Sequence, residues 1–451
     1  MKLRPLHLSS KVTTARVFAI AAPSMLANLT TPLIGIVSTT AIGRLGDAPL
    51  LGGVAMASFI FDCLFWLFGF LRMGTLAFTA QAIGAGETKQ LPVHLVRGLA
   101  LAVLVGAGLI ALQIPLSAIL LQVMGGSADV TAAAKAYFTI RIWSSPLALA
   151  NYAVLGWLIG QARARLALVI QFAINLINMV ATIVLVLRMG TGITGAAAAT
   201  IVAEAGGLAI GLLIAIRLSG GSLAVPRAAA LDRAALMRML TVNRDIMIRT
   251  AALIAAFLFF VAQGARAGDV TLAANAVLNN FLLASAFFLD GLANAAEQLC
   301  GQALGARDRN AFTGATRLVV AWGFGFAFVV AASLALFGPS LIDVMTTSDD
   351  VRLAARAYLV FVVVSPLLSV FAFAFDGIYI GATWARDMRN LMLASLAAFL
   401  AAWFALRSFG NAGLWAAQLV HYAARGGLQA LRYPALLKAS FGEVRSARAR
   451  P

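Results

Sequence analysis

The stretch from Arg16 to Gly46 reads RVFAIAAPSMLANLTTPLIGIVSTTAIGRLG. A run this long and this apolar predicts a membrane-spanning helix, because about 20 apolar residues suffice to cross the hydrocarbon core. Pro32 lies inside the run, and we expect it to act as a hinge. Four residues spaced three or four apart share one face of the predicted helix: Asn28, Thr31, Gly35 and Ser38. A bendable helix with one polar face indicates the wall of a solute pathway.

The composition excludes a soluble protein. Of the 451 residues, 62% are hydrophobic and only 11% are charged, whereas soluble domains carry roughly 45–50% and about 25%. The net charge of +17 could suggest nucleic acid, but the basic residues are spread over successive loops, so we expect no nucleic-acid partner. The sequence contains no catalytic signature and no metal-ligand cluster, which argues against an enzyme, a metal site or a bound cofactor.

Twelve membrane spans are predicted along the chain. Lys and Arg concentrate in the loops of one side, which places both termini in the cytoplasm and the protein in the inner (plasma) membrane. The predicted spans are 14–42, 50–80, 93–123, 132–159, 165–187, 193–217, 240–265, 271–302, 312–342, 352–381, 389–408 and 412–437.

An internal repeat divides these spans into two groups of six. The string QAIGAGETKQ, which begins at Gln81, is similar to QALGARDRNA, which begins at Gln302. The pair Ser145-Pro146 likewise recurs as Ser365-Pro366, and both offsets are about 220 residues. A shift by six spans preserves orientation, so the halves are parallel repeats. We therefore predict an all-α polytopic protein with two pseudo-symmetric six-helix lobes. The predicted parts are a first lobe (1–217), a cytoplasmic linker (218–239), a second lobe (240–440) and a cytoplasmic tail (441–451).

Polar residues within the spans are the candidate functional groups, because polar groups inside a membrane must be satisfied by protein or water. On span five, Gln171, Asn175, Asn178 and Thr182 share one face and could line a cavity together with span one, or hydrogen-bond between packed helices. Four carboxylates are candidates for ion coupling: Glu204, Asp290, Glu297 and Asp376. The alternative for Glu297 or Asp376 is a structural ion pair, for instance with Arg425. Asp245 and Arg249, four residues apart, predict a local ion pair.

Several longer strings resemble the multidrug and toxic compound extrusion (MATE) family, in particular its DinF-type branch. They include AAPSMLANLTTPLIGIVSTTAIGRLG in the first span, TAQAIGAGE after the second, and FLDGLANAAEQLCGQALGARDR and DGIYIGATWARDMRN in the second half. The resemblance covers roughly residues 16 to 430. It implies two six-helix lobes around a central cavity and export of amphiphilic, often cationic compounds against inward H⁺ or Na⁺.

The chain departs from the family pattern at two positions of the first lobe. Ser38 stands where the DinF-type pattern has an aspartate that serves as its principal proton site, and Thr182 stands where the family has a second aspartate. A hydroxyl cannot release a proton near neutral pH. In the related NorM-type branch the cation site lies in the second lobe, on helices seven, eight and ten. Asp290 and Asp376 lie on the corresponding spans, so the resemblance suggests coupling in the second lobe or at Glu204.

The sequence thus predicts a secondary active exporter of organic cations that works by alternating access and is coupled to H⁺ or Na⁺. An uncoupled facilitator, or an exporter of a metabolite or lipid-linked precursor, is the alternative, because both first-lobe acids are replaced. A membrane-embedded enzyme or a receptor would require a clustered catalytic constellation. We expect a small amphiphilic, cationic substrate, a lipid bilayer around the protein, and a monomer.

Overall fold

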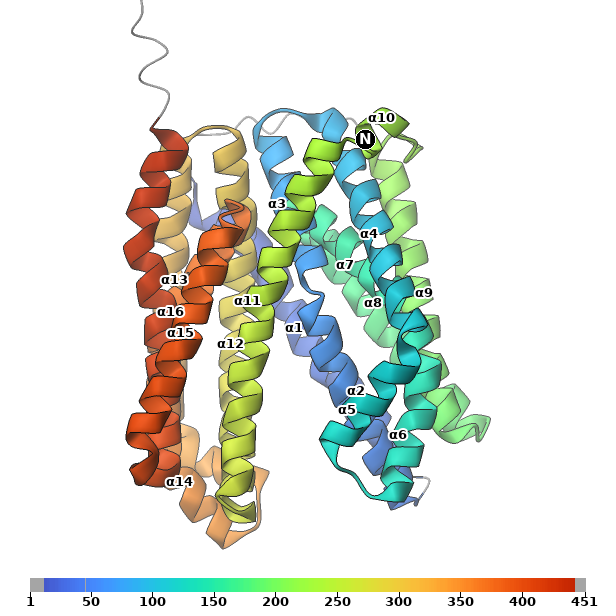
Figure 1. Ribbon diagram of the computed structural model, residues 1–451, viewed down its shortest axis with the longest axis vertical. Coiled ribbons are helices and arrows are strands. Elements are labelled where there is room, and N and C mark those ends of the chain that lie inside the picture. Colours follow the sequence, from blue (N-terminus) through green and yellow to red (C-terminus); the bar gives the residue numbers. More distant parts are fainter. Residues whose placement is uncertain (1–11, 45, 443–451) are drawn as a thin grey trace, which may run out of the picture. The chain divides into compact units, whose positions relative to one another are not determined.

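A computed structural model describes residues 12–44 and 46–442, and all regular secondary structure within these ranges is helical. The predicted all-α polytopic class is thereby confirmed (Figure 1). The helices of the first half are α1 (Thr14–Gly43), α2 (Ala48–Leu67), α3 (Phe70–Gly84), η1 (Thr88–Gln90), α4 (Leu91–Ala111), α5 (Gln113–Met124), α6 (Ala128–Arg141), η2 (Ile142–Ser144), α7 (Ser145–Gly160), α8 (Ala164–Thr182), η3 (Ile183–Arg188) and α9 (Gly192–Leu218). Those that follow are α10 (Arg227–Ala230), α11 (Arg233–Arg266), α12 (Asp269–Gly305), α13 (Arg309–Met345), α14 (Asp349–Gly381), α15 (Ala385–Leu406), η4 (Arg407–Phe409) and α16 (Gly410–Phe441).

The apolar helical stretches match the twelve predicted spans. Eleven stretches among the described residues are long and apolar enough to cross a membrane, and the last of them, Ala385–Phe441, contains both α15 and α16. The boundaries differ in places, since α11 begins already at Arg233, inside the predicted linker. Beyond Gly442 the predicted tail lies outside the described residues.

Three predicted spans are each divided into two helices. The span predicted at 93–123 ends as α4 at Ala111 and continues as α5 from Gln113. Pro115 explains this break, because its ring lacks an N–H and collides with the carbonyl four residues earlier. The other breaks fall between α2 and α3, next to Gly69, and between α6 and α7, next to Pro146. None of these interruptions was predicted from the apolar pattern of the sequence.

The chain forms two compact units. Of the described residues, one unit contains 12–25, 80–86 and 244–442, and the other contains 26–44, 46–79 and 87–243. The division therefore falls within three helices: within α1 after Met25, within α3 after Thr79, and within α11 after Asn243. The lobe boundaries expected from the sequence, at residues 217 and 240, stay a prediction.

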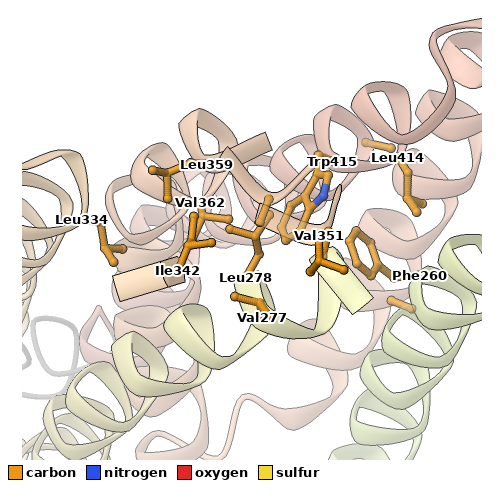
Figure 2. Packing of buried hydrophobic residues seen from close by; sticks show 14 of the residues in the cluster. Phe260, Val277, Leu278, Leu334, Ile342, Val351, Leu359, Val362, Leu414 and Trp415 are labelled. Carbon is orange, nitrogen blue, oxygen red and sulfur yellow. The ribbon is translucent and has the colours of Figure 1, made fainter. Parts of the chain in front are cut away.

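The unit that contains the second half of the chain has a large apolar core. Figure 2 shows side chains of α11, α12, α13, α14 and α16 converging in it, with Phe260, Leu278, Val362 and Trp415 almost completely buried. Next to this core, Asn275 on α12 and Asn411 on α16 exchange two amide hydrogen bonds of 2.9 Å. Trp415 Nε1 also donates to Asn275 Oδ1 at 2.9 Å. This buried polar triad fixes α16 against α12.

The internal repeat reappears as a repeated helix crossing. A Cβ atom built on any of four glycines would overlap a backbone carbonyl oxygen of the facing helix. The pairs are Gly156–Arg72 and Gly160–Leu76 between α7 and α3, and Gly377–Ala293 and Gly381–Glu297 between α14 and α12. Adding 221 to the residue numbers of the first two pairs gives the second two. Small residues allow such close approach of membrane helices, so the repeat seen in the sequence is a repeat in packing.

Candidate functional site: a buried charge cluster

Asp376 on α14 is the centre of a buried ion-pair network. Arg249 on α11 and Arg425 on α16 both donate to its Oδ2 atom, and Gln429 Nε2 donates to its Oδ1 atom at 2.7 Å. Asp376 is 4% exposed, Arg249 4% and Arg425 5%. Removing one partner from a buried ion pair costs about 3–5 kcal/mol, because the remaining charge stays buried without compensation.

The helices place these groups by simple periodicity. Arg425 and Gln429 are four residues apart on α16 and therefore share a face. Asp376 immediately precedes Gly377, whose close contact with Ala293 brings α14 tightly against α12. The local sequence thus sets the face, and the glycine crossing sets the distance between helices.

Two further carboxylates belong to the same region. Asp290 and Glu297 on α12 lie within electrostatic range of Arg249, and Asp290 also lies within range of Arg425. We call Arg249, Asp290, Glu297, Asp376 and Arg425 the charge cluster. Two guanidinium groups face three carboxyl groups in it, so the fully ionised cluster carries one excess negative charge. Four of these five groups are buried and Asp290 is exposed, and one bound proton or one monovalent cation would neutralise the cluster.

The predicted local pair between Asp245 and Arg249 is wrong. Asp245 instead pairs with Arg244 at 3.0 Å and with Arg389 of α15 at 2.7 Å, whereas Arg249 reaches Asp376. Arg249 was missed as a site residue for this reason. Four-residue spacing permits a pair but does not decide it, because a partner on another helix can lie closer.

The ion pair between Asp376 and Arg425, considered from the sequence as the structural alternative, is present. The described residues contain no group of three or more metal-binding side chains. The coupling roles expected for Asp290, Glu297 and Asp376 stay predictions.

In the other unit, the predicted face of α8 is a chain of neutral hydrogen bonds. Gln171 Nε2 donates to Asn175 Oδ1 at 2.9 Å, and Asn175 Nδ2 donates to Thr30 Oγ1 of α1 at 2.7 Å. Asn178 Nδ2 donates to Thr200 Oγ1 of α9 at 3.3 Å. Asn175 and Asn178 are buried, so these contacts favour the helix-packing interpretation over an open cavity lining.

Thr30 and Thr200 were not predicted as site residues. Thr30 lies between the predicted residues Asn28 and Thr31, and Thr200 lies on α9, the helix that follows α8. Thr182, the last residue of α8, is 1% exposed and is followed by a π-helical turn over Ile183–Arg188. Such turns widen a helix and are frequent at functional positions. Asn28 and Ser38 on α1 are half-buried. Thr31 and Pro32 belong to the helical backbone of α1, but their side chains lie outside the described part of the structure.

Glu204 has a specific partner. Asn151 Nδ2 on α7 donates to Glu204 Oε2 at 2.7 Å and to the Glu204 backbone oxygen at 2.9 Å. Tyr152 and Arg141 lie within electrostatic range of Glu204. Glu204 therefore has a defined hydrogen-bond partner and charged neighbours. Its expected role in ion coupling stays a prediction.

Apolar spanning helices, an internal repeat and buried intramembrane charge are typical of multi-pass solute transporters. The MatE family matches residues 23–184 and 246–404 of the chain. The chain therefore belongs to the MatE family of multidrug and toxic compound extrusion transporters, in its DinF-type branch.

Known proteins of the same kind share most of its length. DNA damage-inducible protein F of Escherichia coli is 37% identical over 410 residues, which cover 90% of this chain and 89% of that protein. Protein DETOXIFICATION 44, chloroplastic, of Arabidopsis thaliana is 26% identical over 91% of this chain and 80% of its own length. A MATE transporter of Vibrio cholerae has the same fold, with a TM-score of 0.85 at 20% identity, covering 95% and 98% of the two chains. A MOP superfamily transporter from Pyrococcus furiosus gives a TM-score of 0.81 at 18% identity, covering 94% and 96%.

Proposed function

We propose that this transporter is a secondary active exporter that works by alternating access and is driven by an inward gradient of H⁺ or Na⁺. The observation that carries the proposal is the charge cluster. Its excess negative charge makes binding of one cation favourable, and an ion can drive a conformational switch only if it binds one state better than the other. One elementary charge that crosses a potential of 100 mV supplies about 2.3 kcal/mol for such a switch.

The proposal extends to substrate and setting. We expect a small, amphiphilic, cationic substrate, a monomer, and an inner-membrane location with both termini in the cytoplasm. The distribution of Lys and Arg over the loops supports this orientation.

An uncoupled facilitator, or an exporter of a metabolite or lipid-linked precursor, is the second candidate. The neutral residues Ser38 and Thr182 favour it, since the unit that contains them offers hydroxyls and amides where the family has acids. Such a carrier would move its substrate down the substrate's own gradient only.

The test is export by purified protein in liposomes with an imposed pH gradient or an imposed Na⁺ gradient. Ser38→Asp, which restores the family acid, is assayed beside the natural chain. Accumulation of a fluorescent organic cation that follows either gradient in the natural chain supports ion coupling. Accumulation that ignores both gradients in the natural chain, but follows one in Ser38→Asp, would establish the facilitator.

A further inference from the structure

Within the charge cluster, we infer that Asp290 is the carboxylate that takes up and releases the coupling cation, whereas Asp376 is a fixed counter-ion for Arg249 and Arg425. This division of roles rests on the proposed ion coupling. It separates two acids that the sequence presents as equivalent candidates.

The contacts of Asp376 occupy three of the roughly four acceptor positions of its carboxylate. Its Oδ2 atom receives two guanidinium groups and its Oδ1 atom receives the amide of Gln429. Neutralising Asp376 would leave Arg249 and Arg425 buried with one shared counter-charge fewer. The energetic cost of such a step exceeds what one ion gains from a physiological membrane potential. Asp376 therefore stays ionised through the transport cycle.

Asp290 differs from Asp376 in its accessibility. Its side chain is exposed, although it lies in the middle of α12, whereas Glu297 on the same face is 2% exposed. A carboxylate that faced hydrocarbon would be costly, so an exposed one at this depth indicates contact with water. Asp290 is within electrostatic range of both cluster arginines, and its charge decides whether the cluster is neutral.

Asp290 also lies next to a tight helix contact. A Cβ atom built on Gly291 would come within 2.9 Å of the Ala21 backbone oxygen of α1 and would overlap the Met25 side chain. A change of charge at Asp290 thus occurs beside a close contact of α12 with α1. Since α1 is the helix predicted to bend at Pro32, ion binding at Asp290 acts next to a contact of that helix.

Two charged groups lie within electrostatic range of Asp290: Arg249 on α11 and Arg425 on α16. The titratable groups that in turn face these two arginines are Glu297 on α12, Asp376 on α14, and His421 and Tyr422 on α16. Between Arg317 and Asp343 the α13 sequence has no titratable residue. In the part of α1 grouped with this unit, Arg16 donates to Gln302 at 3.1 Å, far along α12 from Asp290.

The experiment compares two rates in liposomes for each variant. One is accumulation of a fluorescent organic cation driven by a pH gradient without Na⁺, or by a Na⁺ gradient at equal pH. The other is exchange of labelled for unlabelled substrate without any ion gradient. Asp269→Asn, at the start of α12 and outside the cluster, is the matched control and should keep the ratio of the natural chain.

Asp290→Asn should lose its response to the driving gradient while exchange continues. Its ratio of gradient-driven to gradient-free transport should fall to about one, because a carrier that no longer binds the ion cannot respond to it. Asp290→Glu should recover part of the response, which a purely structural role of Asp290 would not explain. The gradient that drives the natural chain distinguishes H⁺ from Na⁺.

Asp376→Asn is expected to lower thermal stability, because Arg249 and Arg425 lose their shared counter-ion. The double variant Asp376→Asn/Arg425→Gln should recover part of the lost stability, because the second substitution removes one of these unpaired charges. The inference is overturned if Asp290→Asn keeps the ratio of the natural chain, or if Asp376→Asn is as stable as the natural chain. A natural chain with a ratio of one in both gradients would instead overturn the proposed function.

Discussion

Two neighbouring glycines of α16 allow a direct test of how tightly the charge cluster is held. A Cβ atom built on Gly426 would lie 2.7 Å from the Ala372 backbone nitrogen and 2.7 Å from the Phe371 Cβ atom of α14, whereas one built on Gly427 would meet no atom within 4 Å. Ordinary carbon contacts are about 3.5–4.0 Å. Gly426→Ala must therefore push α16 away from α14, next to Arg425.

The magnitude follows from comparing the two substitutions. Both replace a helical glycine by alanine, so the gain of up to about 1 kcal/mol in helix propensity is common to them and cancels. The remaining difference is the cost of overpacking, about 1–3 kcal/mol. Gly427→Ala should thus be more stable than Gly426→Ala by this amount.

The assay is reversible unfolding in mixed micelles with increasing denaturing detergent, followed by tryptophan fluorescence. Gly426→Ala should also transport more slowly, because a displaced α16 moves Arg425 relative to Asp376. Equal stability of the two variants, or a more stable Gly426→Ala, would refute the proposed tight packing of α16 on α14.

Three other substitutions test separate features. Asn151→Ala should lower stability by about 0.6–1.7 kcal/mol, because Glu204 loses both amide hydrogen bonds from Asn151. Thermal unfolding measures this, and an unchanged midpoint would contradict these bonds. Asn411→Ala should lower the free energy of unfolding by about 0.6–1.7 kcal/mol, the range for side-chain hydrogen bonds in membrane proteins. A double-mutant cycle with Asn275→Ala measures the coupling energy between the two residues. A coupling energy of zero would contradict the two hydrogen bonds between the Asn275 and Asn411 amides. Pro32→Ala should slow transport and change its pH dependence, because α1 loses its hinge. Liposome export measures the rate and its pH dependence. If both match those of the natural chain, α1 does not bend at Pro32.

The broad architecture could be predicted because the membrane imposes local rules. Every backbone polar group in hydrocarbon must be satisfied within its own segment, so long apolar runs have to be helices. The repeat also has a counterpart in packing, because each half builds the same close helix crossing, at Gly156 and Gly160 in the first half and at Gly377 and Gly381 in the second. The breaks after Ala111 and around Gly69 were not predicted, since hydropathy does not record where a helix is interrupted.

The candidate site was predicted in its parts but not in its connections. The polar face of α8 was predicted, because side chains three or four residues apart share a helix face. The partner of Arg249 was wrong, and Thr30, Asn151 and Thr200 were missed. Each of these residues gains its role from a partner on another helix, and a single sequence holds no record of such contacts.

The sequence by itself therefore determined which segments lie in the membrane, how they repeat, and which carboxylates are present within them. Tertiary structure alone decided that Asp376 is held by two arginines and by Gln429, which is 53 residues away, and that Asp290 is exposed beside them. The physical reason is that the free energy of a buried charge depends on the neighbours that packing brings within a few ångströms, whatever their separation along the chain.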